Sequence, residues 1–140
     1  MPSDGTKVRK IGRKIRVLIA DDQPVIRKMV RSTLQVHPEF EICGEAADGG
    51  QAVKEAKELK PDVVILNITM PVLNGFEAAR EIRATLPGSA IVILSSHADQ
   101  RFVEEAKKLG VRSFVAKTKA GEALVRAVEA AVMGEDFVLI

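Results

Sequence analysis

Five short apolar runs alternate along the chain with five amphipathic segments, and this alternation restricts the possible folds more than any other feature. The runs, rich in β-branched residues, lie at 15–20, 41–46, 63–66, 90–94 and 113–116. The segments between and after them, at 24–36, 51–60, 76–83, 99–109 and 122–133, place apolar residues at helical spacing. Strands that alternate with amphipathic helices predict a parallel sheet covered on both faces. We therefore expect a doubly wound α/β fold of five βα units.

The length and composition favour one compact, soluble domain. The chain has 140 residues, of which 46% are hydrophobic and 29% are charged, and no apolar run is long enough to span a bilayer. We expect a basic leader at 1–14, the domain at 15–133 and an apolar tail at 134–140 that packs on the body or on a partner. Because no apolar segment follows the basic residues of the leader, we expect no secretory signal and a cytoplasmic location.

The charge is unevenly distributed. Residues 1–16 hold six of the 21 basic and one of the 19 acidic residues, so 15 basic and 18 acidic residues remain in the body. Such a leader can touch nucleic acid or an anionic partner, although a short solvated tail is the commoner explanation. Without interleaved aromatics or a helix-turn-helix, nucleic-acid binding is not expected. The single cysteine, Cys43, excludes an internal disulfide and a zinc cluster, and we expect it to be a small buried residue.

Polar residues follow four of the five predicted strands. Asp21 and Asp22 follow the first, Asn67 the third, Ser95 the fourth and Lys117 the fifth. The carboxyl ends of parallel strands meet at one edge of a sheet, where ligands bind in open α/β folds. We therefore expect these side chains to converge.

The chemistry of this edge suits a cation and a phosphoryl group. Adjacent carboxylates such as Asp21 and Asp22 repel each other, and Mg²⁺ takes one or two carboxylates together with phosphate oxygens. Ser95 can hydrogen-bond a phosphoryl oxygen and Lys117 can neutralise one. Taken alone, the acidic pair is also compatible with a solvated strand end, and Asn67 with a strand end that bonds to backbone.

With these strand-end residues and the loop of Met70, Pro71, Asn74 and Gly75, residues 15–133 resemble the response-regulator receiver domain of two-component signalling. The resemblance implies a flavodoxin-like (βα)5 fold with a five-stranded parallel sheet in the order 2-1-3-4-5.

The resemblance also implies roles for individual residues. The Mg²⁺ ligands would be the side chains of Asp21, Asp22 and residue 67 and the main-chain carbonyl of Thr69. Ser95 and Lys117 would contact the phosphoryl group, and Phe114 would be the aromatic switch residue. A plain core position is the alternative for Phe114, which has no hydroxyl to signal through.

Asn67 departs from the family pattern, because it stands where the phosphoacceptor aspartate is expected. A carboxylate can attack phosphorus to form an acyl phosphate, whereas an amide is a poor nucleophile. The lost negative charge should also weaken Mg²⁺ binding. We therefore expect a protein-binding module that is not an enzyme and is incompetent for phosphorylation, whether the change is natural or engineered.

Two other functions stay open. The chain could be an active receiver phosphorylated at another hydroxyl, such as Thr69 or Ser96, or at Asn67 after deamidation. It could also be the receiver part of a DNA-binding transcriptional regulator without its output domain.

The resemblance implies partners as well. A histidine kinase or phosphotransfer protein and a downstream effector would bind, and a homodimer could form, through the fourth predicted helix, fifth strand and fifth helix (99–109, 113–116 and 122–133). No membrane partner is expected.

Overall fold

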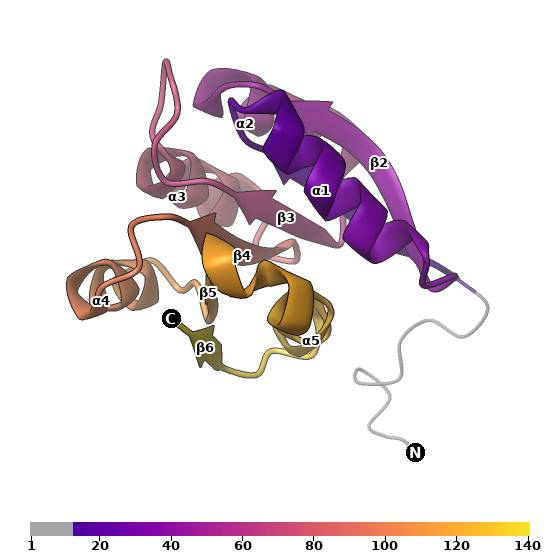
Figure 1. Ribbon diagram of the computed structural model, residues 1–140. Coiled ribbons are helices and arrows are strands. Elements are labelled where there is room, and N and C mark those ends of the chain that lie inside the picture. The colour runs from indigo at the N-terminus through magenta and orange to yellow at the C-terminus, as the bar shows by residue number, and fades with distance from the viewer. Residues whose placement is uncertain (1–12) are drawn as a thin grey trace.

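One parallel sheet organises the computed structural model, which describes residues 13–140 (Figure 1). Within this range its strand order is β2-β1-β3-β4-β5-β6, and every neighbouring pair is parallel. The strands are β1 (Ile15–Ala20), β2 (Phe40–Ala46), β3 (Val63–Leu66), β4 (Ala90–Ser95), β5 (Ser113–Ala116) and β6 (Phe137–Leu139). The predicted doubly wound α/β fold is confirmed. Of the predicted leader, residues 1–12 lie outside the described residues.

Each predicted helix is present. They are α1 (Pro24–Gln35), α2 (Gly49–Leu59), α3 (Gly75–Thr85), α4 (Gln100–Lys108) and α5 (Ala120–Val132), with a short 3₁₀ turn at Lys117–Lys119 before α5. The side chains of Asp48, Asn74 and Asp99 cap the starts of α2, α3 and α4 by accepting backbone N–H groups. None of these helices in the described part of the chain is long and apolar enough to cross a membrane.

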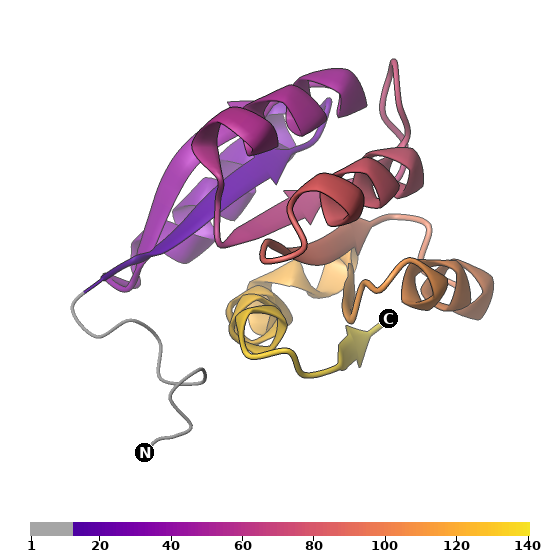
Figure 2. The same ribbon diagram turned by 180° about the vertical axis from the view of Figure 1, so that it is seen from behind.

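The helices cover both faces of the sheet. α1 and α5 lie on one face and α2, α3 and α4 on the other (Figures 1 and 2). Successive side chains of β3 point to opposite faces, so Val63 and Ile65 pack with α1 and α5 while Val64 and Leu66 pack with α2 and α3. All four are buried, which explains why this run is continuously apolar rather than alternating.

The expected number of strands was wrong by one. Within the predicted apolar tail, residues 137–139 form β6, which pairs in parallel with β5. The physical reason is that β5 would otherwise be an open edge with unpaired backbone groups. Side-chain contacts hold the added strand: Phe137 and Leu139 pack against the α5-side core, and the Arg126 guanidinium lies over the Phe137 ring at 5.3 Å.

Strand register brings the strand ends together. Ala20 at the end of β1 pairs with Leu66 at the end of β3, and Ser95 at the end of β4 pairs with Ala116 at the end of β5. The residues that follow these positions therefore meet at one edge of the sheet, as the sequence predicts.

We predict that replacing Phe137 by alanine costs about 1–2 kcal/mol of unfolding free energy, because the half-buried ring loses its core contacts and its contact with Arg126. Val138→Ala is the matched control, since Val138 lies in the same strand but is 39% exposed. Urea denaturation measures both variants. Equal losses would show that β6 is not packed as described.

Candidate functional site

Three buried polar residues mark the carboxyl edge of the sheet. Asp21, Asn67 and Ser95 follow or end β1, β3 and β4, and their exposed fractions are 3%, 5% and 0%. Polar groups are buried at a cost unless they find partners, so the contacts of these side chains define the site.

The carboxylate of Asp21 has a partner for each oxygen. Lys117 Nζ lies 2.9 Å from Oδ2, and the backbone N–H of Gln23 donates to Oδ1 at 2.8 Å. Both members of the ion pair are largely shielded from solvent, with 13% of the Lys117 side chain and 4% of the Asp21 side chain exposed. A buried ion pair needs such additional hydrogen bonds to offset the desolvation of its charges.

Asn67 is joined to the second acidic residue. Its Nδ2 donates to the Thr69 carbonyl oxygen at 2.7 Å and to Asp22 Oδ1 at 3.3 Å. A backbone carbonyl and a carboxylate can only accept hydrogen bonds. The –NH₂ end of the Asn67 amide, rather than its oxygen, therefore faces Asp22 and Thr69.

Ser95 and Phe114 lie at the same edge but are held by other contacts. The Ser95 hydroxyl oxygen accepts the backbone N–H of His97 at 2.8 Å, which shapes the turn after β4. Phe114 is 2% exposed and packs in the core beneath α4, with Val103 and Ala106. The side chain of Phe114 is directed inward in this structure.

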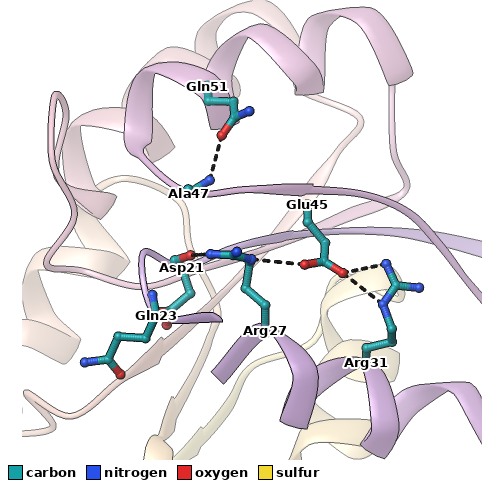
Figure 3. Close-up of polar contacts among 7 residues, drawn as sticks. All are labelled: Asp21, Gln23, Arg27, Arg31, Glu45, Ala47 and Gln51. Atoms are coloured by element: carbon teal, nitrogen blue, oxygen red, sulfur yellow. Dashed lines mark hydrogen bonds and ion pairs between the residues drawn. The ribbon is translucent and has the colours of Figure 1, made fainter. Parts of the chain in front are cut away.

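A network around Arg27 supports the acidic residues and had no signal in the sequence. Figure 3 shows Arg27 of α1 between Asp21 and Glu45: it donates to the Asp21 carbonyl oxygen at 2.6 Å and to Glu45 Oε1 at 3.0 Å. Arg31, one turn later, donates to Glu45 Oε2 at 2.8 Å. The hydrogen bond from Arg31, aided by Arg27, holds the pKa of Glu45 below its ordinary value of 4.5. This network ties α1 and β2 to the backbone of Asp21.

Two glycines position the loop after β3. A Cβ on Gly75 would lie 2.2 Å from the Asn67 carbonyl oxygen, and a Cβ on Gly49 would lie 1.9 Å from the Leu73 carbonyl oxygen. The Gly75 N–H donates to the Ile68 oxygen at 2.6 Å, and the Gly49 N–H donates to the Pro71 oxygen at 3.1 Å. The starts of α2 and α3 thus clamp this loop, and only glycine permits such close approach.

The donor groups can be tested against the predicted magnesium ion. Asp21, Asp22 and the Thr69 carbonyl offer oxygen, which Mg²⁺ prefers. Asn67, however, directs nitrogen at two of these oxygens, and Lys117 already neutralises Asp21. Within residues 13–140 no group of three or more His, Cys, Asp or Glu side chains is arranged to hold a metal ion. In this arrangement the residues do not fit Mg²⁺.

Cys43 lies away from this edge, in the middle of β2, and is only partly buried. Burial raises the pKa of its thiol above the ordinary value of 9.0, so the thiol is protonated at neutral pH and is a weak nucleophile.

Comparison with known proteins gives a consistent result. The family model described as response regulator receiver domain matches residues 17–129. Among curated proteins, the chemotaxis protein CheY of Thermotoga maritima is 41% identical over 102 residues, which cover 73% of this chain and 84% of that protein. An uncharacterized transcriptional regulatory protein of Bacillus subtilis, YxjL, is 38% identical over 122 residues, which cover 87% of this chain and 56% of the relative.

Solved structures agree with this likeness. The crystal structure of a two-component response regulator of the LuxR family from Aurantimonas superposes with a TM-score of 0.85 at 31% identity and covers 89% of each chain. The chain spans about half the length of the first curated relatives that it matches, with 56%, 53% and 52% of their residues covered.

We predict that Gly75→Ala destabilises the protein by about 2–3 kcal/mol, because the new methyl group collides with the backbone of Asn67 and Ile68. Gly121→Ala is the control: Gly121 lies in α5 with nothing within 4 Å of a new Cβ, and it should gain roughly 0.5–1 kcal/mol from helix propensity. Thermal unfolding compares the two variants. A tolerated Gly75→Ala would mean that the loop is not clamped.

A second prediction concerns pH. Because folding lowers the pKa of Glu45, its ionised form adds stability above the unfolded-state pKa, and this stability is lost as pH falls through the folded-state pKa. Glu45→Gln should therefore cost about 0.5–1 kcal/mol at neutral pH and almost nothing in acid below the folded-state pKa of Glu45. The exposed Glu81→Gln is the control. Urea denaturation across pH measures the difference, and a pH-independent loss would refute the ion-pair explanation.

Proposed function

The chain belongs to the response regulator receiver domain family, and from this premise we propose that it acts in two-component signalling as a protein-binding module without phosphorylation at residue 67. The observation that carries this proposal is Asn67 at the end of β3, with its amide nitrogen bonded to Asp22 and Thr69. This position at the carboxyl edge of the sheet, in contact with Asp22, is where the family pattern expects the phosphoacceptor.

The chemistry of the amide supports the proposal. The amide lone pair on nitrogen is delocalised into the carbonyl, so neither atom attacks phosphorus as a carboxylate oxygen does. The –NH₂ group is also engaged with two acceptors. In this proposal the protein acts by binding rather than by catalysis, Mg²⁺ binding is at most weak, and Ser95 and Lys117 keep internal structural partners.

The proposed partners are a histidine kinase or phosphotransfer protein and a downstream effector, or a second copy of the chain. The predicted docking side comprises α4, β5 and α5, and the presence of β6 changes its composition. Because β6 pairs along β5, a partner on this side meets β6 between the two helices. Val138 and Ile140 expose apolar surface there, with exposed fractions of 39% and 43%. The proposal includes a cytoplasmic location, where the free Cys43 thiol stays reduced.

Phosphorylation elsewhere is a weaker alternative. Thr69 and Ser96 are exposed hydroxyl residues near the edge, but neither has a contact with Lys117 that would activate it among the described residues. Deamidation of Asn67 is hindered by the β-branched, buried Ile68 that follows it.

One finding favours a second candidate function. The curated relatives include transcriptional regulatory proteins of which this chain covers 52–56%. The chain could therefore be the receiver part of a longer DNA-binding regulator. The intact mass of the protein from its natural source tests this candidate: 15.2 kDa would oppose it, and about twice that mass would support it.

The main proposal is tested by phosphorylation of the protein and of Asn67→Asp with a small acyl phosphate donor and Mg²⁺, followed by intact-mass measurement. We expect no uptake by the protein and one phosphoryl group on the variant, because the variant regains a nucleophilic carboxylate at the end of β3.

The control is Asn74→Asp, which makes the same chemical change at the exposed cap of α3. It should take up no phosphate. Uptake by the unaltered protein would overturn the proposal, and uptake by none of the three proteins would show that the remaining site is no longer competent.

A further inference from the structure

The amide nitrogen of Asn67 lies between two oxygens that belong to different parts of the chain. The Thr69 carbonyl is in the loop after β3, and Asp22 follows β1. A group that carries partial positive charge therefore joins these oxygens across two neighbouring strands. The resemblance to receiver domains implies instead that a divalent cation binds both Asp22 and the Thr69 carbonyl.

Charge balance at this edge supports a role for the amide in place of a cation. Asp21 and Asp22 contribute two negative charges and Lys117 contributes one positive charge, so these side chains sum to −1. A carboxylate at residue 67 would bring the sum to −2, with Asp21 and residue 67 buried and Asp22 exposed to solvent. Like charges so close raise the free energy of the folded state strongly unless a cation neutralises them. With an amide at residue 67, the additional negative charge is absent, and a neutralising cation is largely unnecessary.

Magnesium would have to displace contacts that already exist. The ion binds oxygen at about 2.0–2.1 Å in octahedral geometry, so it cannot share Asp22 Oδ1 and the Thr69 oxygen with an –NH₂ group directed at both. Asn67 would have to turn its amide over and lose both hydrogen bonds, at 3.3 and 2.7 Å. Asp21 would have to give up part of its ion pair with Lys117 at 2.9 Å.

We propose that the Asn67 side chain replaces the divalent cation at this edge, so that β1, β3 and the loop after β3 are held in place without Mg²⁺. The inference rests on the proposed function, since both need an amide at residue 67, but it concerns metal dependence rather than phosphate transfer. It follows that partner binding by this protein does not depend on the Mg²⁺ concentration.

The test is a magnesium titration of the full chain and of Asn67→Asp at constant ionic strength. Two-dimensional ¹⁵N NMR and thermal unfolding are the two readouts. In the unaltered protein, the backbone signals of Asp22 and Thr69 should not move with Mg²⁺, and the melting temperature should not change. In Asn67→Asp, the same signals should shift in a saturable way, and Mg²⁺ should raise the melting temperature by roughly 5 °C. Without Mg²⁺, this variant should melt below the unaltered protein.

The side-chain signals of Asn67 give a second, independent readout. The chain has two asparagines, Asn67 and Asn74, so each –NH₂ pair is assigned from the variant in which it disappears. We expect the Asn67 protons to exchange with water at least tenfold more slowly than those of Asn74, whose side chain is exposed.

Asn74→Asp is again the matched control, because it adds one negative charge at the exposed cap of α3 rather than at residue 67. It should behave as the unaltered protein does in the titration. Saturable Mg²⁺ shifts at Asp22 and Thr69 in the unaltered protein, with an affinity within about tenfold of that of Asn67→Asp, would overturn the inference. So would fast exchange of the Asn67 amide protons.

The two proposals can fail separately. Magnesium binding without phosphate uptake would refute the replacement of the cation and leave the phosphorylation-independent function intact. Phosphate uptake by the unaltered protein would refute the proposed function itself.

Discussion

The buried carboxylate of Asp21 is the constraint on which the carboxyl edge depends. A charge with so little solvent contact must be neutralised locally, and its partner Lys117 comes from the far end of β5, with β3 and β4 between them in the sheet. The ion pair can form only if all four strands end at the same level. It therefore links the register of the whole sheet to the geometry of the site, and Arg27 adds α1 and β2 to the same unit through the Asp21 carbonyl and Glu45.

Within that frame, one side chain changes the chemistry of the edge. Asn67 differs from aspartate by an –NH₂ group in place of an oxygen, which turns an acceptor into a donor and removes one negative charge. This –NH₂ group gives the Asp22 carboxylate and the Thr69 carbonyl a hydrogen-bond donor from within the chain. This single difference is the basis of the proposal that the protein acts by binding rather than by phosphorylation at residue 67.

The surface on the β5 side is formed in part by β6. β6 lies along β5 and contributes Val138 to the exposed side, Ile140 after it is also exposed, and Phe137 and Leu139 pack against the core. Partners that recognise this side of a receiver would contact an added strand. Among the described residues β6 is the outermost strand on this side of the sheet, and an edge strand offers backbone groups on which a further strand could pair.

The sequence by itself determined the class of fold and which polar residues end the strands, because hydrophobic periodicity and strand-end polar residues are local signals. Asp21, Asn67, Ser95 and Lys117 could be assigned to one edge since parallel strands share their direction. Only the tertiary structure decided how these residues pair. Whether Lys117 contacts Asp21 or Asn67, and which end of the amide faces Asp22, depends on how segments far apart in the chain pack against one another. The Arg27 network with Glu45 and the pairing of β6 with β5 were missed for the same reason: non-local contacts are set by packing in three dimensions, and no short stretch of residues encodes them.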